Sequence, residues 1–482
     1  MALGLALGFT NFGFTNPAQP AAANSTNPQA CVLTAQEITR KSDLLREAAE
    51  GDRKARQQYD QLLKAHSDKL AKCRRDNWPQ NQALWLRLYP CDLKPGVLEQ
   101  VLDQVVNQGY NQVYVESFYS GRTLLPLQDN DTAWPSVVTS RDHSDADLLA
   151  QAIKQGRERG LKVYAWMYSM NFGASYAAGR GSVLARNGKG QTSLELVADG
   201  PQAFVDPYNR EALRDYNKLV RKIAARRPDG ILFDYIRYPR GSGTASVADN
   251  VKDLLIYSPA SREALISRAR NNQGQELISR FMDRGYVRPD DIQQVMKKYP
   301  QEDQPMWQGR IPAKWDNKTS IKQRQEQLQQ ELWLLSVAHA YQGVVDFLNL
   351  AIQPALELGL PAGAVFFPGG NQTVGRQGFD SRLQPWERFA PQLEWHPMSY
   401  AACGTTSCIL DEVKQVLQQS PAGGRVQPAL AGTWGSSYGN RPSLEAQMVA
   451  LGSLSSRINT VSHFAYSWQQ PQNDANRKAC RL

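Results

Sequence analysis

The sequence predicts an α/β fold, a (β/α)8 barrel of the TIM type with a helical hairpin before it and an inserted segment after its fourth strand. Short apolar runs alternate with amphipathic helical patterns, and eight such runs can be counted. This alternation is typical of a parallel sheet with right-handed crossovers. No Gly-x-Gly-x-x-Gly motif follows a strand, which disfavours an open dinucleotide-binding sheet.

Length and composition are those of a globular protein with a large core. The chain has 482 residues, of which 41% are apolar and 21% are charged, and no apolar run after the first residues is long enough to cross a bilayer. We therefore expect no transmembrane span in the mature chain. The formal charge of +9 is spread along the sequence without a Lys/Arg block or an RNA-type aromatic motif, so nucleic acid is not an expected partner. Protein partners stay unknown.

The first residues resemble an export signal. Residues 1–24 combine an apolar stretch with small residues and end in a plausible cleavage site near Ala23. The positively charged start of such signals is missing, so either the true start lies upstream or the segment is a flexible tail. Together with the cysteines, it favours an exported protein, periplasmic or extracellular and associated with the cell wall.

The six cysteines show no CxxC or Cys/His spacing of the metal type, so we expect structural disulfides. Two polar helices, 34–50 and 52–72, form the predicted hairpin 31–75 and bring Cys31 and Cys73 to the same end. Cys403 and Cys408 can close a short loop, which leaves Cys91 to pair with Cys480. The alternative is six buried, reduced thiols.

The barrel is predicted over 83–470 and is followed by a C-terminal tail, 471–482. Helix 95–109 has apolar residues at the spacing of an amphipathic helix and ends at Gly109. Glycine likewise ends helix 148–159, and helix 210–225 leads directly into the fourth strand. The eight predicted strands are 83–89, 113–118, 161–168, 231–233, 363–367, 393–400, 426–434 and 460–468.

Residues 241–330 interrupt the alternation, with helical patches around 260–283 and 289–299. Because this insertion follows the exit of strand four, we expect it on the active face, as a lid or as a wall of the cleft. A long helix over about 320–358, with a possible break near Gly343, restores the pattern, and 443–455 is the helix before the last strand.

Asp234 is the first candidate catalytic residue. In Asp229–Pro239, Gly230 allows a tight entry turn, 231–233 is a buried strand, and Pro239 ends it because proline cannot donate to a sheet. Asp234 thus lies at the carboxyl end of a barrel strand, which in such barrels is the active face. A helix-capping aspartate is the alternative interpretation.

Breaking an acetal requires a proton donor and a second carboxylate at the anomeric carbon. At the predicted strand exits the clear carboxylates are Asp234 and Glu116, since Glu394 comes too early in its strand. We assign Asp234 as nucleophile or principal catalytic carboxylate and Glu116 as proton donor, with ligand binding or pairing to arginine as the alternative for Glu116. The predicted substrate-binding residues are Arg87, Trp166, Tyr168, Asp206, Tyr235, Arg237, Tyr400, Trp434 and His463.

Other chemistries lack support in the sequence. No Gly-x-Ser-x-Gly elbow is present, and the five histidines are not spaced with carboxylates as metal ligands. We therefore expect no metal and no cofactor. A core role is an alternative for His463.

Two segments resemble a known family. Val205–Tyr216, followed by Pro228–Pro239, is similar to the paired signature of the bacterial glycosyl-hydrolase-like barrels called family-10-like, which include a lipoprotein that cleaves peptide-free peptidoglycan strands at the division site. The resemblance implies a TIM barrel, export, a polysaccharide substrate and a catalytic position for Asp234. Many relatives have Asp-Asp where this chain has Asp234-Tyr235, which leaves the second acid open.

The predicted function is a glycoside hydrolase acting on a cell-wall or extracellular polysaccharide, with peptidoglycan glycan strands as the leading substrate. A carboxyl separation of ~5 Å predicts retention and ~6.5–9.5 Å predicts inversion. The alternatives are an inactive carbohydrate-binding barrel that acts as a wall-associated scaffold, and a deacetylase, which would require a metal site.

Overall fold

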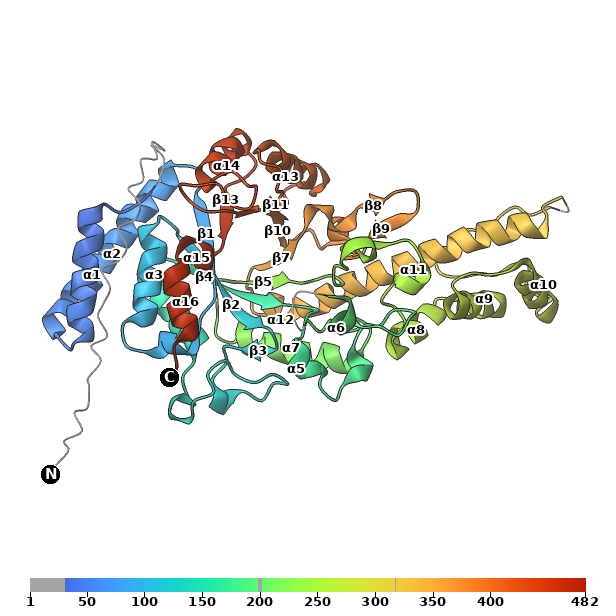
Figure 1. Cartoon of the computed structure of the whole chain (residues 1–482), viewed down its shortest axis with the longest axis horizontal. Coiled ribbons are helices and arrows are strands. Elements are labelled where there is room, and N and C mark those ends of the chain that lie inside the picture. The colour runs from blue at the N-terminus through green and yellow to red at the C-terminus, as the bar shows by residue number, and fades with distance from the viewer. Residues whose placement is uncertain (1–30, 198–201, 317) are drawn as a thin grey trace, which may run out of the picture.

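The molecule is elongated, with a barrel in the middle, a helical hairpin at one end and a helical arm at the other (Figure 1). The computed structural model describes residues 31–197, 202–316 and 318–482. The signal-like segment 1–24 lies outside the described residues. No helix in these described ranges is long and apolar enough to cross a membrane.

The central sheet closes into a parallel barrel, as the sequence predicts. Neighbouring strands run β1-β13-β12-β10-β7-β5-β4-β2, and β1 also pairs with β2, which completes the ring. The short strands β3 (Arg122–Thr123) and β11 (Arg425–Val426) are attached to it. The ring consists of β1 (Asn81–Leu86), β2 (Gln112–Tyr119), β4 (Lys162–Tyr168), β5 (Gly230–Asp234), β7 (Ala362–Phe366), β10 (Glu394–Ser399), β12 (Ala429–Ala431) and β13 (Thr460–Phe464).

Amphipathic helices cover the outside of the ring (Figure 1). In α7 the apolar residues recur at helical spacing and are buried, while its arginines and lysines face solvent or ion pairs. The covering helices are α3 (Val97–Asn107), α4 (Leu148–Glu158), α7 (Arg210–Ala224), α11 (Ile321–Ala351), α12 (Gln353–Glu357), α13 (Ser407–Gln419) and α14 (Leu444–Leu451). The short helices are α5 (Ala174–Ala177), α6 (Ser193–Leu196), α15 (Tyr466–Gln469) and α16 (Pro471–Ala479).

Two predicted strands are too long. The predicted seventh strand, 426–434, is split into β11 and β12, because Pro428 between them has no N–H to donate to a ladder. The predicted eighth strand, 460–468, ends at Phe464, and the next residues form α15. The aromatic residues Tyr466 and Trp468 have a high strand propensity, but they lie in α15, after the end of the sheet.

The long helix is continuous through Gly343 and ends at Ala351. The sequence predicts a possible break at this glycine, yet packing explains its presence, because a Cβ there would lie 2.7 Å from Cγ of Pro207. The break comes later, at Ile352, and Pro354 is the second residue of the next helix, α12.

The N-terminal hairpin consists of α1 (Ala35–Ala49) and α2 (Arg53–Asp76). All three predicted disulfides are present, with Cα–Cα distances of 5.7 Å for Cys31–Cys73, 6.0 Å for Cys91–Cys480 and 6.5 Å for Cys403–Cys408. The first closes the hairpin, and the second ties the exit of β1 to α16.

A buried polar cluster attaches the hairpin to the barrel. Asp103 of α3 accepts hydrogen bonds from Tyr59 Oη at 2.8 Å and Arg159 Nε at 2.9 Å, and its carboxylate lies 3.7 Å from Lys41 Nζ. All four side chains are almost inaccessible to solvent. One carboxylate therefore compensates two buried cations, and the four side chains connect α1, α2 and α3 with the residue that follows α4.

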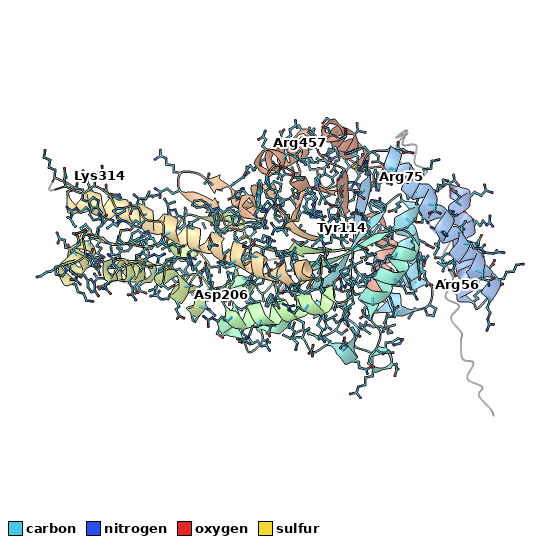
Figure 2. All side chains as sticks on the ribbon, turned by 180° about the vertical axis from the view of Figure 1, so that it is seen from behind. Arg56, Arg75, Tyr114, Asp206, Lys314 and Arg457 are labelled. Atoms are coloured by element: carbon cyan, nitrogen blue, oxygen red, sulfur yellow. A yellow bond between two sulfur atoms is a disulfide. The ribbon has the colours of Figure 1, made fainter. Side chains whose placement is uncertain are left out.

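The insertion forms an arm along the first half of α11. Figure 2 shows Lys314 near its far end, Asp206 near its base and Tyr114 inside the barrel. Helix α11 is attached to the insertion by hydrogen bonds from Arg310 Nε to Glu331 at 2.6 Å and from the Val287 N–H to Gln329 at 2.9 Å. The arm contains α8 (Pro259–Ile266), α9 (Asn272–Arg284) and α10 (Pro289–Lys298).

The start of the insertion lies beside the loop that follows β7. There β6 (Val247–Ala248) pairs with β9 (Gly378–Asp380), which pairs with β8 (Thr373–Val374) in a small antiparallel sheet. The helical patches predicted around 260–283 and 289–299 are confirmed as α8, α9 and α10. The role of the insertion as a lid or wall of the cleft stays a prediction.

We predict that Asp103→Asn lowers the free energy of unfolding by about 3–5 kcal/mol, because it leaves two buried cations without their carboxylate. Chemical denaturation followed by circular dichroism measures the change. Asp43→Asn is the matched control, since Asp43 forms an exposed pair with Arg46 and its loss should cost less than about 1 kcal/mol. Equal effects of the two substitutions would contradict the assigned role of Asp103.

Candidate active site

Asp234 is the last residue of β5 and is held by two N–H donors. The indole Nε1 of Trp166 donates to Oδ2 at 3.0 Å, and the backbone N–H of Tyr235 donates to Oδ1 at 2.6 Å. Asp234 is opposite Tyr168 in the neighbouring strand β4. The side chain is only 6% exposed, so its orientation is fixed by these two donors and not by solvent.

Burial is the main influence on the ionisation of Asp234. It raises the pKa of the carboxyl to about 6, against the opposing effects of the Tyr235 N–H, the Arg237 guanidinium and the Trp166 indole, while the charge of Glu116 adds to the rise. The carboxyl therefore titrates near neutral pH. A group with such a pKa can both donate and accept a proton under physiological conditions.

The backbone directly after Asp234 has an uncommon conformation. Tyr235 has φ +53°, in the left-handed region of the backbone that residues other than glycine, asparagine and aspartate rarely adopt. This conformation turns the Tyr235 N–H back onto the Asp234 carboxylate. Tyr235 stands in the place of a second aspartate, and its backbone N–H donates to the Asp234 carboxylate.

Glu116 is fully buried and is paired with Arg87. The guanidinium donates through Nε to Oε2 and through Nη2 to Oε1, the latter at 3.0 Å. Arg87 also lies over the ring of Tyr119, 4.5 Å from its centroid. A carboxylate that accepts two hydrogen bonds from one guanidinium is bound in its charged form. Glu116 is therefore paired with an arginine, which is the alternative interpretation given for it from the sequence.

The two acids are not adjacent. Glu116 is on β2 and Asp234 is on β5, with β4 between them, where Trp166 is the register partner of Glu116. Two steps across a sheet separate strands by ~10 Å, and Asp234 also lies two residues beyond Leu232, the β5 partner of Trp166. The charge of Glu116 nevertheless influences Asp234, so the two carboxylates share one electrostatic environment toward the carboxyl ends of β2 and β5.

Aromatic rings surround Asp234. The rings of Tyr168 and Tyr235 are 4.2 Å apart, and Trp166 lies 6.0 Å from Tyr168 and 6.3 Å from Phe464. Tyr400 continues the wall, 5.9 Å from Phe464. Burial and the nearby Asp234 carboxylate raise the pKa of Tyr400. Flat rings around a carboxylate suit the apolar faces of sugar rings.

Arg237 lies in the same region, enclosed by rings. Its guanidinium carbon is 4.9 Å from the ring centroid of Tyr235, and 5.6 Å from those of Phe204 and Phe367. Its one hydrogen bond within the described residues goes from Nη1 to the carbonyl oxygen of Tyr238, at 3.0 Å. The structure thus brings together eight of the predicted site residues: Arg87, Glu116, Trp166, Tyr168, Asp234, Tyr235, Arg237 and Tyr400.

Asp206 has a different environment. It is completely buried and accepts hydrogen bonds from Ser258 Oγ at 2.7 Å, from the Ser261 N–H at 3.0 Å and from the Tyr208 N–H at 2.9 Å. Burial raises the pKa of the Asp206 carboxyl in spite of these donors. Asp206 thus fastens the N-terminal end of α8 to the loop after β4, at the base of the arm.

His463 and Trp434 contact each other outside the barrel interior. The side chains of Ser462 and Phe464 point into the barrel, and because side chains alternate along a strand, His463 points toward the helices. There its ring lies 3.0 Å from the Tyr110 hydroxyl, which accepts a hydrogen bond from Trp434 Nε1 at 3.1 Å. Burial lowers the pKa of His463 to about 3. Both residues belong to a packed layer away from Asp234.

Three phenylalanines of this region are absent from the predicted set: Phe204, Phe367 and Phe464. Phe464 could have been found from the alternation of inward and outward residues in its strand. Phe204 and Phe367 lie in the loops after β4 and β7, where periodicity gives no orientation. Helix α13 is also missing from the sequence prediction, although its apolar residues at 409, 413, 416 and 417 have helical spacing.

A cavity of about 420 Å³ lies next to this site and not over Asp234. It begins at Tyr238 and Pro239, the last residues of the Asp234 motif, and extends between Lys189, Asp249 and Ser381. Within the described ranges no group of three or more His, Cys, Asp or Glu side chains is arranged to hold a metal ion.

Comparisons of the sequence found no relative, and comparisons of the structure found distant likenesses in shape. No protein-family profile matches the chain, and neither does any curated protein sequence. Solved structures with a similar shape include a glycoside hydrolase domain and two glycosidases. That of PgaB (BpsB) from Bordetella bronchiseptica is 14% identical over 83% of this chain and 99% of its own, with a TM-score of 0.47. The β-galactosidase of Marinomonas ef1 is 10% identical over 80% of this chain and 54% of its own, also at 0.47. A GH20 exo-β-N-acetylglucosaminidase from Vibrio harveyi is 8% identical over 83% of this chain and 53% of its own, at 0.39.

We predict that Trp166→Phe raises the pKa of Asp234 above about 6, because it removes a hydrogen bond to the charged carboxylate. A pH titration of ¹³C-labelled aspartate by NMR measures the shift. Trp85→Phe is the matched control, since the Trp85 indole contacts Trp166 but donates to Ser462. A pKa that is unchanged in Trp166→Phe would contradict the assigned contact.

Proposed function

We propose that the protein is an exported glycoside hydrolase that cleaves a cell-wall or extracellular polysaccharide, with peptidoglycan glycan strands as the leading substrate. The observation that carries the proposal is Asp234, a buried carboxyl with a pKa of about 6 at the carboxyl end of a barrel strand, surrounded by aromatic rings. The three disulfides are consistent with export.

Asp234 is the group best suited to transfer a proton. Its carboxyl protonates the oxygen of the leaving sugar while the bond from that oxygen to the anomeric carbon breaks. Water then adds its hydroxyl to the anomeric carbon and returns a proton to Asp234. The two N–H donors of Trp166 and Tyr235 stabilise the carboxylate that forms after the first transfer.

The environments of the two acids favour an exchange of the roles assigned from sequence. Both carboxylate oxygens of Glu116 are engaged as acceptors of hydrogen bonds from Arg87. As a fixed negative charge it can stabilise the positive charge that develops on the sugar ring. In this proposal Asp234 is the acid and Glu116 is the electrostatic partner.

A catalytically inactive carbohydrate-binding barrel is the second candidate. The specific observation in its favour is the Arg87–Glu116 pair, which engages the second carboxylate in an ion pair. The aromatic wall would then bind glycan without cleavage. Release of reducing ends by the wild-type protein separates the two candidates.

We predict that Asp234→Asn lowers kcat for release of reducing ends from purified peptide-free glycan by about 10²–10⁴-fold, since it removes the proton donor. Binding of the same glycan should persist, because the aromatic wall is unchanged. Reducing-end assays and a co-sedimentation assay measure the two properties. Asp206→Asn is the matched control for a buried aspartate outside the site. Full activity of Asp234→Asn would remove Asp234 from the mechanism.

The pH dependence of kcat/KM should report the role of Asp234. If Asp234 donates the proton, its neutral form is active, and kcat/KM falls as pH rises above about 6. If it acts as a nucleophile, its charged form is active, and kcat/KM falls as pH drops below about 6. We expect kcat/KM to fall above about pH 6. A fall below about pH 6 would instead support Asp234 as the nucleophile, the role assigned to it from the sequence.

A further inference from the structure

Arg237 carries a buried charge without an acidic partner. The residue is 9% exposed, and its Nε is inaccessible and has no hydrogen-bond partner in the described part of the chain. Its hydrogen bond from Nη1 goes to a neutral acceptor, the carbonyl oxygen of Tyr238. No carboxylate among the described residues lies within 4.0 Å of the guanidinium nitrogens, although Asp234 and Asp380 act on it from a greater distance.

The other arginines nearby differ in this respect. Arg87 is paired with Glu116. Arg382, which lies on the same Phe367 ring at 4.5 Å, makes two hydrogen bonds of 2.7 Å to Asp380. Arg237 is thus the member of this group whose charge the protein does not compensate by an ion pair.

An uncompensated buried guanidinium is costly, and a ligand that supplied a carboxylate would remove that cost. The rings of Phe204, Tyr235 and Phe367 hold the guanidinium in place, so little side-chain freedom remains to be lost on binding. The planar fork of an arginine matches the two oxygens of a carboxylate.

We propose that Arg237 binds a carboxylate of the substrate, so that the preferred glycan is acidic and carries a carboxylate on a sugar at or beside the cleaved bond. This inference rests on the proposed function and names the substrate class of the same site. The net charge of +9 supports it, because a basic protein attracts an anionic polymer.

A competing role for Arg237 is to act on Asp234 itself. Its charge favours the ionised form of that carboxyl. In this case the loss of Arg237 would shift the pH profile of kcat on every substrate. In the proposed case it would raise KM, and only for glycans that carry carboxylates.

The experiment combines Arg237→Gln with two substrates, peptide-free peptidoglycan strands and the same strands with their carboxylates reduced to alcohols. We expect wild-type kcat/KM to fall about 10- to 100-fold on the reduced strands, the effect of losing a charge-assisted hydrogen bond. On the native strands, kcat/KM of Arg237→Gln should be lower than that of the wild type by the same factor. On the reduced strands, the variant and the wild type should have equal kcat/KM. Arg240→Gln, an exposed charge of the same segment, should behave as wild type on both.

Several outcomes would overturn the inference while the proposed function stands. These are equal wild-type activity on both substrates, equal losses of Arg237→Gln on both, or a shifted pH profile as its main effect. If the wild-type protein cleaves neither substrate, the proposed function fails, and binding affinities of the two proteins for the two strands test Arg237 in the same way. Thermal melts verify that Arg237→Gln is folded, and Arg237→Lys, which keeps the charge but not the fork, should show an intermediate loss.

Discussion

The burial of one carboxylate, Asp234, is the constraint on which the rest of the site depends. Burial favours the neutral acid, while the Trp166 indole and the Tyr235 N–H favour the charged form. The balance between them brings the pKa of the group close to neutrality. The left-handed backbone at Tyr235 and the inward position of Trp166 on β4 both contribute to this balance. A small number of backbone and strand positions therefore sets the chemistry of the site.

Charges around Asp234 are divided between paired and unpaired groups. Glu116 and Arg87 compensate each other, and so do Arg382 and Asp380. Asp234 and Arg237 are both buried without an ion pair at contact distance. Buried ionisable groups that lack an ion-pair partner are typical of sites that bind and transform ligands. At the hairpin end of the molecule the Asp103 carboxylate has all its partners and serves to hold the hairpin on the barrel.

Much of the fold could be predicted from the sequence, because strands and helices of a barrel alternate with a regular pattern. The position of Asp234 followed from an apolar run that ends in an acid, and the hairpin geometry gave the Cys31–Cys73 bond. Orientation was harder to predict. His463 lies one residue from inward-facing Phe464 and points the other way. Asp206 belongs to the family-like motif, yet it caps a helix of the insertion. The pairing of Glu116 with Arg87 depends on contacts between strands, which periodicity does not report.

The most direct test of the central claim compares two pKa values in one protein, that of the Asp234 carboxyl by NMR and that of the descending limb of kcat/KM. In the wild-type protein we expect both near 6, and in Trp166→Phe we expect both to rise together. Agreement in both proteins would identify Asp234 as the group whose proton is transferred. A kinetic pKa that stays in place while the pKa of Asp234 moves would contradict that assignment.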